Sequence, residues 1–309
     1  MNKLPNVAIL LTTFNSEKYL EQQLQSLVNQ KFVKVNIYIS DDNSQDKTLK
    51  LLNLFSKKNK GVIKKIYQVN FKDPNKNFLN LIKKVPKYDF YAMADHDDVW
   101  LSDKLIRALK ILKKGYILYG SRVKAVDKDL NFIGYSPKFK KKPSFKNALV
   151  QALFANCTAV FTYEMLDLFR SYKIDFNKKF KTDPSWLLYL LATFHGKKVF
   201  YDKTPKILYR QHENNVMGLG SSYLHKLRSL YYFFSGVNKK MNDMHIKFLK
   251  NIKSNQPKEN IKVLELFDNL RKKMNFFKFN NMLLKKSGVY RQTKKGNILL
   301  KIGLILNLE

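Results

Sequence analysis

The chain has 309 residues, 45% of them hydrophobic, which is enough for one large α/β domain or for a domain with an appendage. Its 58 Lys and Arg outnumber its 24 Asp and Glu and give a net charge of +34. This imbalance favours a phosphate-rich partner such as an anionic membrane or a nucleic acid, or it reflects only genomic base composition. Because the excess is lysine spread along the chain, not arginine for base edges, no nucleic acid is expected.

The cysteine count and the length of the apolar runs indicate the cellular compartment of the protein. One cysteine, Cys157, excludes an internal disulfide framework and favours a reducing compartment. Its apolar neighbours predict a small buried side chain and not a nucleophile. The N-terminus has no cleavage-site pattern, and no apolar run reaches the roughly 18 to 20 residues that span a bilayer. We expect a cytoplasmic protein.

The N-terminal part of the chain alternates between strand-like and helix-like segments. Apolar, β-like residues at 7–13 lead into helical spacing over 17–30, and the same succession recurs at 35–40 and 46–56. A further helix is expected near 75–84, before a buried strand at 89–94. This β-α-β-α order predicts an α/β fold with a mainly parallel sheet and covering helices.

The remaining elements are expected to extend this sheet and then to add helices. Ser102 is a candidate N-cap for the next helix. Strands are expected at 116–123, 158–163 and 198–201, and a helix at 186–194. Beyond about Gly220 only helical patterns occur. The sequence thus predicts a domain over 1–220 and a basic, aromatic-rich helical region over 221–309.

Three carboxylates, Asp95, Asp97 and Asp98, follow the buried strand at 89–94 within four positions. Alternation along an extended chain would place Asp95 and Asp97 on one face, where they would repel by about 4 kcal/mol at an effective dielectric of about 20. A divalent cation such as Mg²⁺ or Mn²⁺ relieves this repulsion and takes phosphate oxygens as further ligands. The alternative is a solvated turn in which Asp98 caps the next helix.

Polar or acidic turns around Thr12, Asp42 and Asp97 follow three of the expected parallel strands. Ligands of open parallel sheets bind at the carboxyl ends of the strands, so these turns are expected to meet in one crevice. Taken alone, Asp42 could instead stabilise its own loop as an Asx-turn residue. Thr12 could equally serve only strand-end packing.

Five motifs carry a resemblance to a known family, in family order and spacing over about residues 5–220. They are Leu10-Leu-Thr-Thr-Phe-Asn15, Ser40-Asp-Asp-Asn-Ser-Gln-Asp46, Asp95-His-Asp-Asp-Val-Trp100, Thr182-Asp183 with Trp186, and Tyr209-Arg-Gln-His212. The chain resembles a family 2 glycosyltransferase of the GT-A fold, a Rossmann-like sheet flanked by helices, here with a C-terminal helical appendage. Within that family it is most similar to bacterial polysaccharide rhamnosyltransferases.

The resemblance implies a site for a nucleotide-diphosphate sugar. Thr12 and Phe14 would contact base and ribose, and Asp42 would accept a hydrogen bond from the base imide, which a cytosine lacks. Asp97 would be the metal ligand that bridges to the diphosphate, and Asp95 would contact ribose or metal-bound water as a second member of the metal site. Asp98 is expected to support the loop and His96 to be structural.

The resemblance also implies a general base and a phosphate-side loop. Asp183 matches the base that takes the proton of the acceptor hydroxyl in an inverting transfer. Relatives usually have His-Asp directly before Trp, whereas this chain has Thr182-Asp183-Pro-Ser-Trp186, so Asp183 could also be a helix N-cap before Pro184. Arg210 offers a planar fork for phosphate, and His212 can donate to phosphate or approach the metal.

We therefore expect a metal-dependent inverting glycosyltransferase, peripheral on the inner face of the plasma membrane. The best donor candidate is dTDP-L-rhamnose, with UDP-hexose or UDP-N-acetylhexosamine as alternatives, and the acceptor would be a lipid-linked saccharide in cell-surface polysaccharide synthesis. The competing class is a non-catalytic nucleotide or nucleic-acid binder. Aromatic clusters at 231–234 and 276–279 among lysines would either dock on an anionic membrane surface or form the core of a helical cap.

Overall fold

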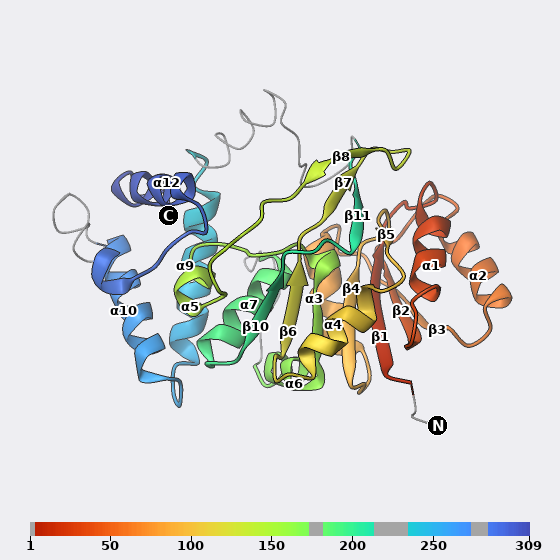
Figure 1. Cartoon of the computed structure of the whole chain (residues 1–309), viewed down its shortest axis with the longest axis horizontal. Coiled ribbons are helices and arrows are strands. Elements are labelled where there is room, and N and C mark those ends of the chain that lie inside the picture. Colours follow the sequence, from red (N-terminus) through yellow and green to blue (C-terminus); the bar gives the residue numbers. More distant parts are fainter. Residues whose placement is uncertain (1–3, 173–181, 213–233, 273–283) are drawn as a thin grey trace. The chain divides into compact units, whose positions relative to one another are not determined.

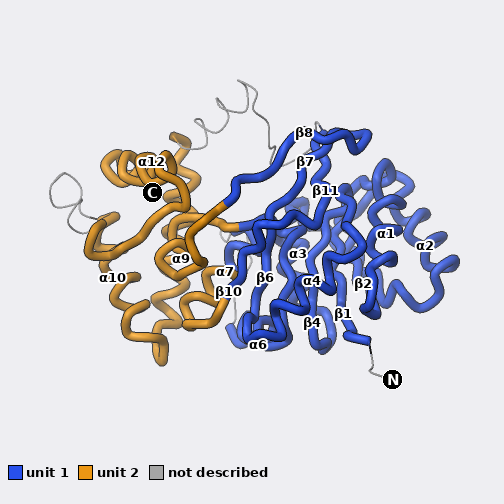
Figure 2. The backbone as a smooth tube through the Cα atoms, viewed as in Figure 1, with its two compact units in different colours: residues 1–138, 154–188, 199–219 blue, residues 139–153, 189–198, 220–309 orange. Residues whose placement is uncertain are grey.

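The computed structural model describes residues 4–172, 182–212, 234–272 and 284–309 (Figure 1). The chain divides into two compact units (Figure 2). Unit 1 comprises residues 1–138, 154–188 and 199–219, and unit 2 comprises residues 139–153, 189–198 and 220–309. Unit 2 thus includes two segments that precede residue 220, and the assignment of separate roles to 1–220 and 221–309 stays a prediction.

A seven-stranded sheet in the order β10-β6-β9-β4-β1-β2-β3 is the framework of unit 1. Every strand is parallel to the others except β9, which runs antiparallel to β4 and β6. The mainly parallel sheet is therefore confirmed. The strands are β1 Asn6–Thr13, β2 Lys34–Asp41, β3 Ile63–Gln68, β4 Phe90–Ala94, β6 Leu118–Ser121, β9 Val160–Thr162 and β10 Val199–Asp202.

The register of the three central strands brings their carboxyl ends to the same edge of the sheet. Leu11 of β1 pairs with Ala94 of β4, and Thr13 of β1 pairs with Asp41 of β2. All three strands run in the same direction, so the turns that follow them leave the sheet side by side. This confirms that the turns around Thr12, Asp42 and Asp97 lie at neighbouring strand ends.

Helices cover both faces of the sheet. The apolar sides of α1 Leu20–Val28, α2 Thr48–Lys58 and α4 Lys104–Leu112 join the inward residues of β1 and β2 in one buried cluster. α3 Pro74–Lys84 and α6 Tyr163–Arg170 contribute nothing to that cluster but contact β1, β2 and β9, so they cover the opposite face. The expected helix N-cap at Ser102 is wrong, because α4 begins after Asp103 without a capping side chain.

A second, four-stranded sheet was not predicted from the sequence. Its order is β5-β11-β7-β8, formed by β5 Val99–Trp100, β11 Ile207–Arg210, β7 Lys124–Val126 and β8 Phe132–Tyr135. β5 directly follows the acidic residues 95–98, and β11 pairs with β5 and with β7. This small sheet therefore brings the segment around Arg210 next to the acidic residues, although the two are far apart in sequence.

The described part of unit 2 consists of helices joined by loops. It contains α5 Phe145–Ala148, the second half of α7 Pro184–Phe194, α9 Val237–Asn251, α10 Lys258–Lys272 and α12 Lys294–Ile305. Asn260 of α10 donates to the carbonyls of Thr193 and Phe194 at the end of α7. Arg291 donates to the buried Glu309 side chain at 2.7 Å. The prediction of helices beyond Gly220 is confirmed for these residues.

The two alternatives for the aromatic clusters at 231–234 and 276–279, membrane docking and the core of a helical cap, depend on residues that are only partly described. Of the aromatic clusters, Tyr231, Tyr232, Phe233, Phe276, Phe277 and Phe279 lie outside the described residues, and Phe234 is described and exposed. Among the described helices, none is both long enough and apolar enough to cross a bilayer.

Candidate active site

The turn after β2 is held by the buried carboxylate of Asp41. This carboxylate accepts hydrogen bonds from Thr13 Oγ1 at 2.7 Å, from Ser44 N at 2.9 Å and from Ser44 Oγ at 2.6 Å. Asn43 completes the turn with φ of 62°, a left-handed conformation that asparagine tolerates better than most residues. The strand ends of β1 and β2 are therefore fixed to one another.

Asp42 points away from this turn and toward the next loop. Its two carboxylate oxygens accept hydrogen bonds from the backbone nitrogens of Phe71 and Asp73. The alternative in which Asp42 stabilises its own turn is wrong, because Asp41 does so. Thr12 is buried at the end of β1, whereas the Phe14 side chain is 51% exposed beside it. The roles of Thr12, Phe14 and Asp42 in nucleoside binding stay predictions.

The chain bends after β4, so the extended conformation expected through Asp97 is wrong. The bend is held by two polar side chains of α1 and by Gln30, which follows the helix. Gln23 Nε2 donates to the Asp95 carbonyl at 2.7 Å, Ser26 Oγ accepts from Trp100 N at 3.0 Å, and Gln30 Nε2 donates to the Leu101 carbonyl at 2.9 Å.

These supporting residues were missed in the sequence, although a signal for them exists. Gln23 and Ser26 are spaced i, i+3 on the side of the helix that carries buried leucines, and the buried Gln30 follows just after the helix. Polar residues at buried positions of an amphipathic helix normally have a hydrogen-bonding role. Here that role is to fix the backbone of the acidic turn, residues Asp95–Asp98.

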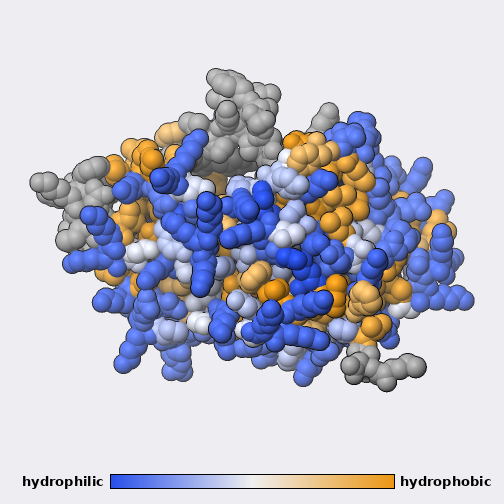
Figure 3. Space-filling view, in the orientation of Figure 1, coloured by the Kyte–Doolittle hydropathy of each residue, from blue (hydrophilic) through white to orange (hydrophobic). Residues whose placement is uncertain are grey.

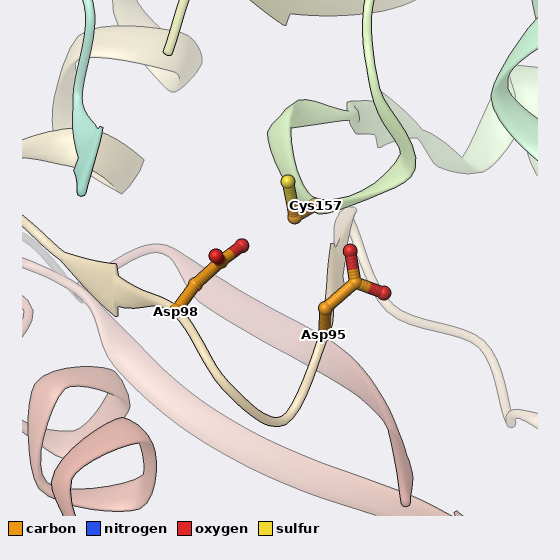
Figure 4. Close-up of side chains that lie close together, drawn as sticks. All are labelled: Asp95, Asp98 and Cys157. Carbon is orange, nitrogen blue, oxygen red and sulfur yellow. The ribbon is translucent and has the colours of Figure 1, made fainter. Parts of the chain in front are cut away.

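The bend brings two of the three carboxylates together with the single cysteine. Asp95, Asp98 and Cys157, which lies in the short helix η1 Asn156–Thr158, each place a possible ligand atom within 4.8 Å of the others (Figure 4). Burial, followed by the charge of Asp97, raises the pKa of both Asp95 and Asp98. Cys157 is buried as predicted, and burial raises the pKa of its thiol.

Asp97 faces the other way, toward the end of β11. Its Oδ2 lies 2.9 Å from His212 Nε2, within hydrogen-bond distance. Burial acts to raise the pKa of Asp97, but the bond to His212 and the charges of His96 and His212 hold it below the usual aspartate value. Asp97 is therefore the most readily ionised carboxylate of the acidic turn.

Arg210 is buried and holds the acidic turn through hydrogen bonds to Asp97 and Asp98. Its Nε donates to the Asp97 carbonyl at 2.8 Å, and its backbone N–H donates to Asp98 Oδ1 at 3.2 Å. Its other guanidinium nitrogens donate to the Lys128 carbonyl and to Gln22, and the guanidinium carbon lies 4.3 Å from the centroid of the Tyr19 ring. Phosphate binding by Arg210 stays a prediction; the observed contacts are those of a positioning residue.

Asp183 caps α7. Its Oδ1 accepts hydrogen bonds from Ser185 Oγ at 2.7 Å and from Trp186 N at 2.9 Å, with Pro184 as the first helical residue. The N-cap role is therefore confirmed. Burial raises the pKa of Asp183, and its charge contributes to the raised pKa of Asp95, so it lies close to the acidic turn. The role of general base stays a prediction.

Lys104 is a further charged group that no pattern in the sequence singles out. It is fully buried in α4, with Nζ 3.3 Å from the centroid of the Trp100 ring. Burial lowers the pKa of Lys104 to about 7, and the charges of Cys157 and Asp98 oppose this shift. A lysine on an amphipathic helix is normally exposed, so helical spacing alone does not indicate burial.

The acidic turn has the ligand chemistry of a hard divalent cation. Mg²⁺ and Mn²⁺ prefer carboxylate oxygens, and the turn offers three carboxylates, including a buried Asp98 Oδ2 to which no described residue donates a hydrogen bond. A thiophilic metal fits less well, because the group contains one thiol beside two carboxylates. The residues present thus fit a metal bound through oxygen.

Open, mainly parallel sheets bind their ligands at the carboxyl ends of the strands, where the acidic turn lies, and sequence comparison identifies the family. Residues 8–169 match the family described as Glycosyl transferase family 2. The chain is 33% identical over 234 residues to the dTDP-rhamnosyl transferase RfbG of Shigella flexneri, which covers 71% of this chain and 78% of the relative. The chain belongs to glycosyl transferase family 2, which confirms the resemblance, and it is a sugar-transferring enzyme.

A second relative and two solved structures agree. The chain is 27% identical over 223 residues to a GalNAc(5)-diNAcBac-PP-undecaprenol beta-1,3-glucosyltransferase of Campylobacter jejuni, covering 71% of this chain and 69% of the relative. S. aureus TarS 1-349 in complex with UDP-GlcNAc has a TM-score of 0.59 at 16% identity and covers 98% and 79%. The mannosyltransferase PcManGT from Pyrobaculum calidifontis, in complex with GDP-Man and Mn²⁺, has a TM-score of 0.51 at 12% identity and covers 100% and 89%. The GT-A fold is confirmed.

Proposed function

We propose that this enzyme is a metal-dependent inverting glycosyltransferase that moves a sugar from a nucleotide-diphosphate donor to a lipid-linked saccharide. The observation that carries the proposal is the acidic turn at the end of β4, with Asp97 and Asp98 buried, close to a half-buried fourth carboxylate, Asp183. Such a set of acids repels a diphosphate unless a cation is present, so it fits catalysis better than simple nucleotide or nucleic-acid binding.

Asp97 would hold Mg²⁺ or Mn²⁺, and Asp95, whose carboxylate lies with Asp98 and Cys157, would contact ribose or metal-bound water as the second member of the metal site. When bound, the ion stabilises the charge that develops on the departing nucleoside diphosphate. The low pKa of Asp97 suits this role, because its carboxylate is ionised at neutral pH without a metal. His212 and Arg210 keep the Asp97 carboxylate and backbone in place before any ligand arrives.

Asp183 would act as the general base. The acceptor hydroxyl oxygen forms a bond to the anomeric carbon of the donor, on the face opposite the diphosphate, while Asp183 takes the hydroxyl proton. The bond between the anomeric carbon and the diphosphate oxygen breaks, and its electron pair leaves with the nucleoside diphosphate. The configuration of the sugar is thereby inverted. Burial raises the pKa of Asp183, which strengthens it as a base, and its N-cap bonds fix its orientation.

The best donor candidate is dTDP-L-rhamnose. Support comes from the 33% identity to a relative described as a dTDP-rhamnosyl transferase. Thr12 and Phe14 would contact the nucleoside, and Asp42 would accept a hydrogen bond from the N3–H of thymine or uracil. A second candidate is UDP-glucose, because the relative at 27% identity is described as a glucosyltransferase.

The acceptor candidate is a saccharide on a lipid diphosphate, handled at the inner face of the plasma membrane. The name of the C. jejuni relative includes a PP-undecaprenol acceptor, which supports this choice. The net charge of +34 would favour both an anionic acceptor and an anionic membrane surface.

A screen of sugar nucleotides for thermal stabilisation tests the donor, because a ligand that binds only the folded state raises Tm. We expect dTDP-L-rhamnose with Mn²⁺ to raise Tm more than UDP-glucose, UDP-N-acetylglucosamine or GDP-mannose. The same sugar nucleotide should be hydrolysed or transferred in the presence of Mn²⁺ and spared in the presence of a chelator. Greater stabilisation by UDP-glucose would favour the second donor, and no turnover of any donor would reject the enzymatic proposal.

A further inference from the structure

The helix α12 of unit 2 exposes an unusual run of large apolar side chains. Ile298 is 59% exposed, Ile302 39% and Ile305 45%, and Leu306, directly after the helix, is 51% exposed. Their successive spacings of four, three and one positions place all four on one side of the helix. Single exposed apolar residues are common in soluble proteins, but a contiguous group marks a site that is covered by something.

The opposite side of α12 is already used by the fold. Leu300, Gly303 and Leu304 are buried, and a Cβ at Gly303 would lie 2.6 Å from Cγ of Glu309, so this side packs tightly against unit 2. Glu309 is in turn bonded to Arg291 at 2.7 Å. The helix is therefore fixed by one side, and the apolar residues of the other side cannot turn inward to complete a core.

Every other exposed position of α12 is a lysine. Lys294, Lys295 and Lys301 accompany the four apolar residues, and the helix contains no acidic residue. In Figure 3 hydrophobic atoms are visible over the position that α12 occupies in Figure 1, with hydrophilic side chains around them. An apolar strip bordered by lysines is the arrangement of helices that lie in the plane of a bilayer interface.

We propose that the outer face of α12, formed by Ile298, Ile302, Ile305, Leu306 and the three lysines, docks on an anionic lipid bilayer. The apolar side chains enter the headgroup boundary and the lysines bind lipid phosphates. A second copy of the chain fits less well, because two such faces in contact would bring six lysines together without an acidic partner on either helix. The proposal deepens the function proposed above, since it names the surface that brings the enzyme to a lipid-linked acceptor.

Vesicle sedimentation of the full chain tests this surface. The first variant combines Ile298→Ser, Ile302→Ser and Ile305→Ser. Its matched control combines Phe132→Ser, Ile133→Ser and Tyr135→Ser, which removes three exposed apolar side chains of β8 in unit 1. Vesicles of phosphatidylcholine mixed with phosphatidylglycerol are compared with vesicles of phosphatidylcholine alone, in low and in high salt.

We expect the wild type and the β8 variant to bind the anionic vesicles, and the α12 variant to bind at least about tenfold more weakly. Replacing Lys294, Lys295 and Lys301 by Gln should weaken binding by about fivefold per lysine in low salt and have less effect in high salt. Equal binding by the α12 and wild-type proteins, or loss confined to the β8 variant, would overturn the proposal.

Two further measurements separate this proposal from its rivals and from the proposed enzymatic function. Light scattering of the wild type and the α12 variant reports on self-association, and a dimer that only the wild type forms would assign the face to a second copy. Hydrolysis of a soluble donor should be unchanged in the α12 variant, which also shows that it folds. Vesicle binding through α12 in a protein that turns over no donor would leave docking intact and reject only the transfer reaction.

Discussion

The acidic turn of unit 1 and the outer face of α12 in unit 2 use charge in opposite ways. In the turn, carboxylates of like sign are buried together, and their backbone is held by α1 and by Arg210. On α12, lysines are exposed around an apolar strip. The net charge of +34 therefore says little about the reaction, because the acidic residues that the chemistry requires are gathered in one turn.

This contrast implies that catalysis and docking are separable. Substitutions in the turn should change metal binding and transfer without changing vesicle binding. Substitutions on α12 should do the reverse. A change that affects both equally would mean that the two regions act as one site.

The largest expected effect is that of Asp183→Asn. Loss of the general base should lower kcat for transfer at least about 100-fold and leave binding of the donor unchanged. Asp167→Asn is a matched control, since Asp167 is an exposed aspartate of α6, which begins where β9 ends, beside the start of β4 and not its carboxyl end. Initial rates of the two variants measure kcat, and donor titrations measure donor binding. Near-normal transfer by Asp183→Asn would assign the general base to another residue.

The pH profile sharpens the same prediction. A base works only when it is ionised, and burial raises the pKa of Asp183 above the ordinary aspartate value. The wild-type rate should therefore fall on the acid side at a higher pH than an exposed aspartate would give. The residual rate of Asp183→Asn should not show this fall. A wild-type profile that stays flat down to the ordinary aspartate range would contradict a buried base.

A smaller effect is expected in unit 2, on stability instead of catalysis. His245 of α9 is buried, and burial lowers its pKa to about 3. In the unfolded chain this histidine binds a proton near pH 6.5, whereas in the folded chain it stays neutral to a much lower pH. The free energy of unfolding is therefore highest above that pH and falls as pH is lowered, by about 2 kcal/mol at pH 5. Denaturant unfolding of the wild type and of His245→Gln at pH 7 and pH 5 measures this loss. The variant should lose less stability, and equal losses would show that other groups carry the acid sensitivity.

The sequence predicted the large sheet because its strands and helices have strong, local periodicity. It missed β3, whose side chains are mostly only half buried or exposed, and the small sheet, where β5 has two residues and β7 has three. Such short strands exist through pairing between distant segments and leave no local signal. The acidic turn could be predicted because acidic residues at the end of a buried strand are unusual. Its bend could not be predicted, because side chains of α1, which are distant in sequence, hold the turn in that conformation.

The measurement that bears most directly on the acidic turn is the affinity for the most stabilising sugar nucleotide, determined calorimetrically with Mn²⁺ and with a chelator. The wild type and Asp167→Asn should bind at least about tenfold more tightly with Mn²⁺. Asp97→Asn should lose that difference while keeping its fold. Equal affinity of the wild type with and without the metal, or an Asp97→Asn protein with undiminished metal dependence, would contradict a metal and diphosphate site at Asp97.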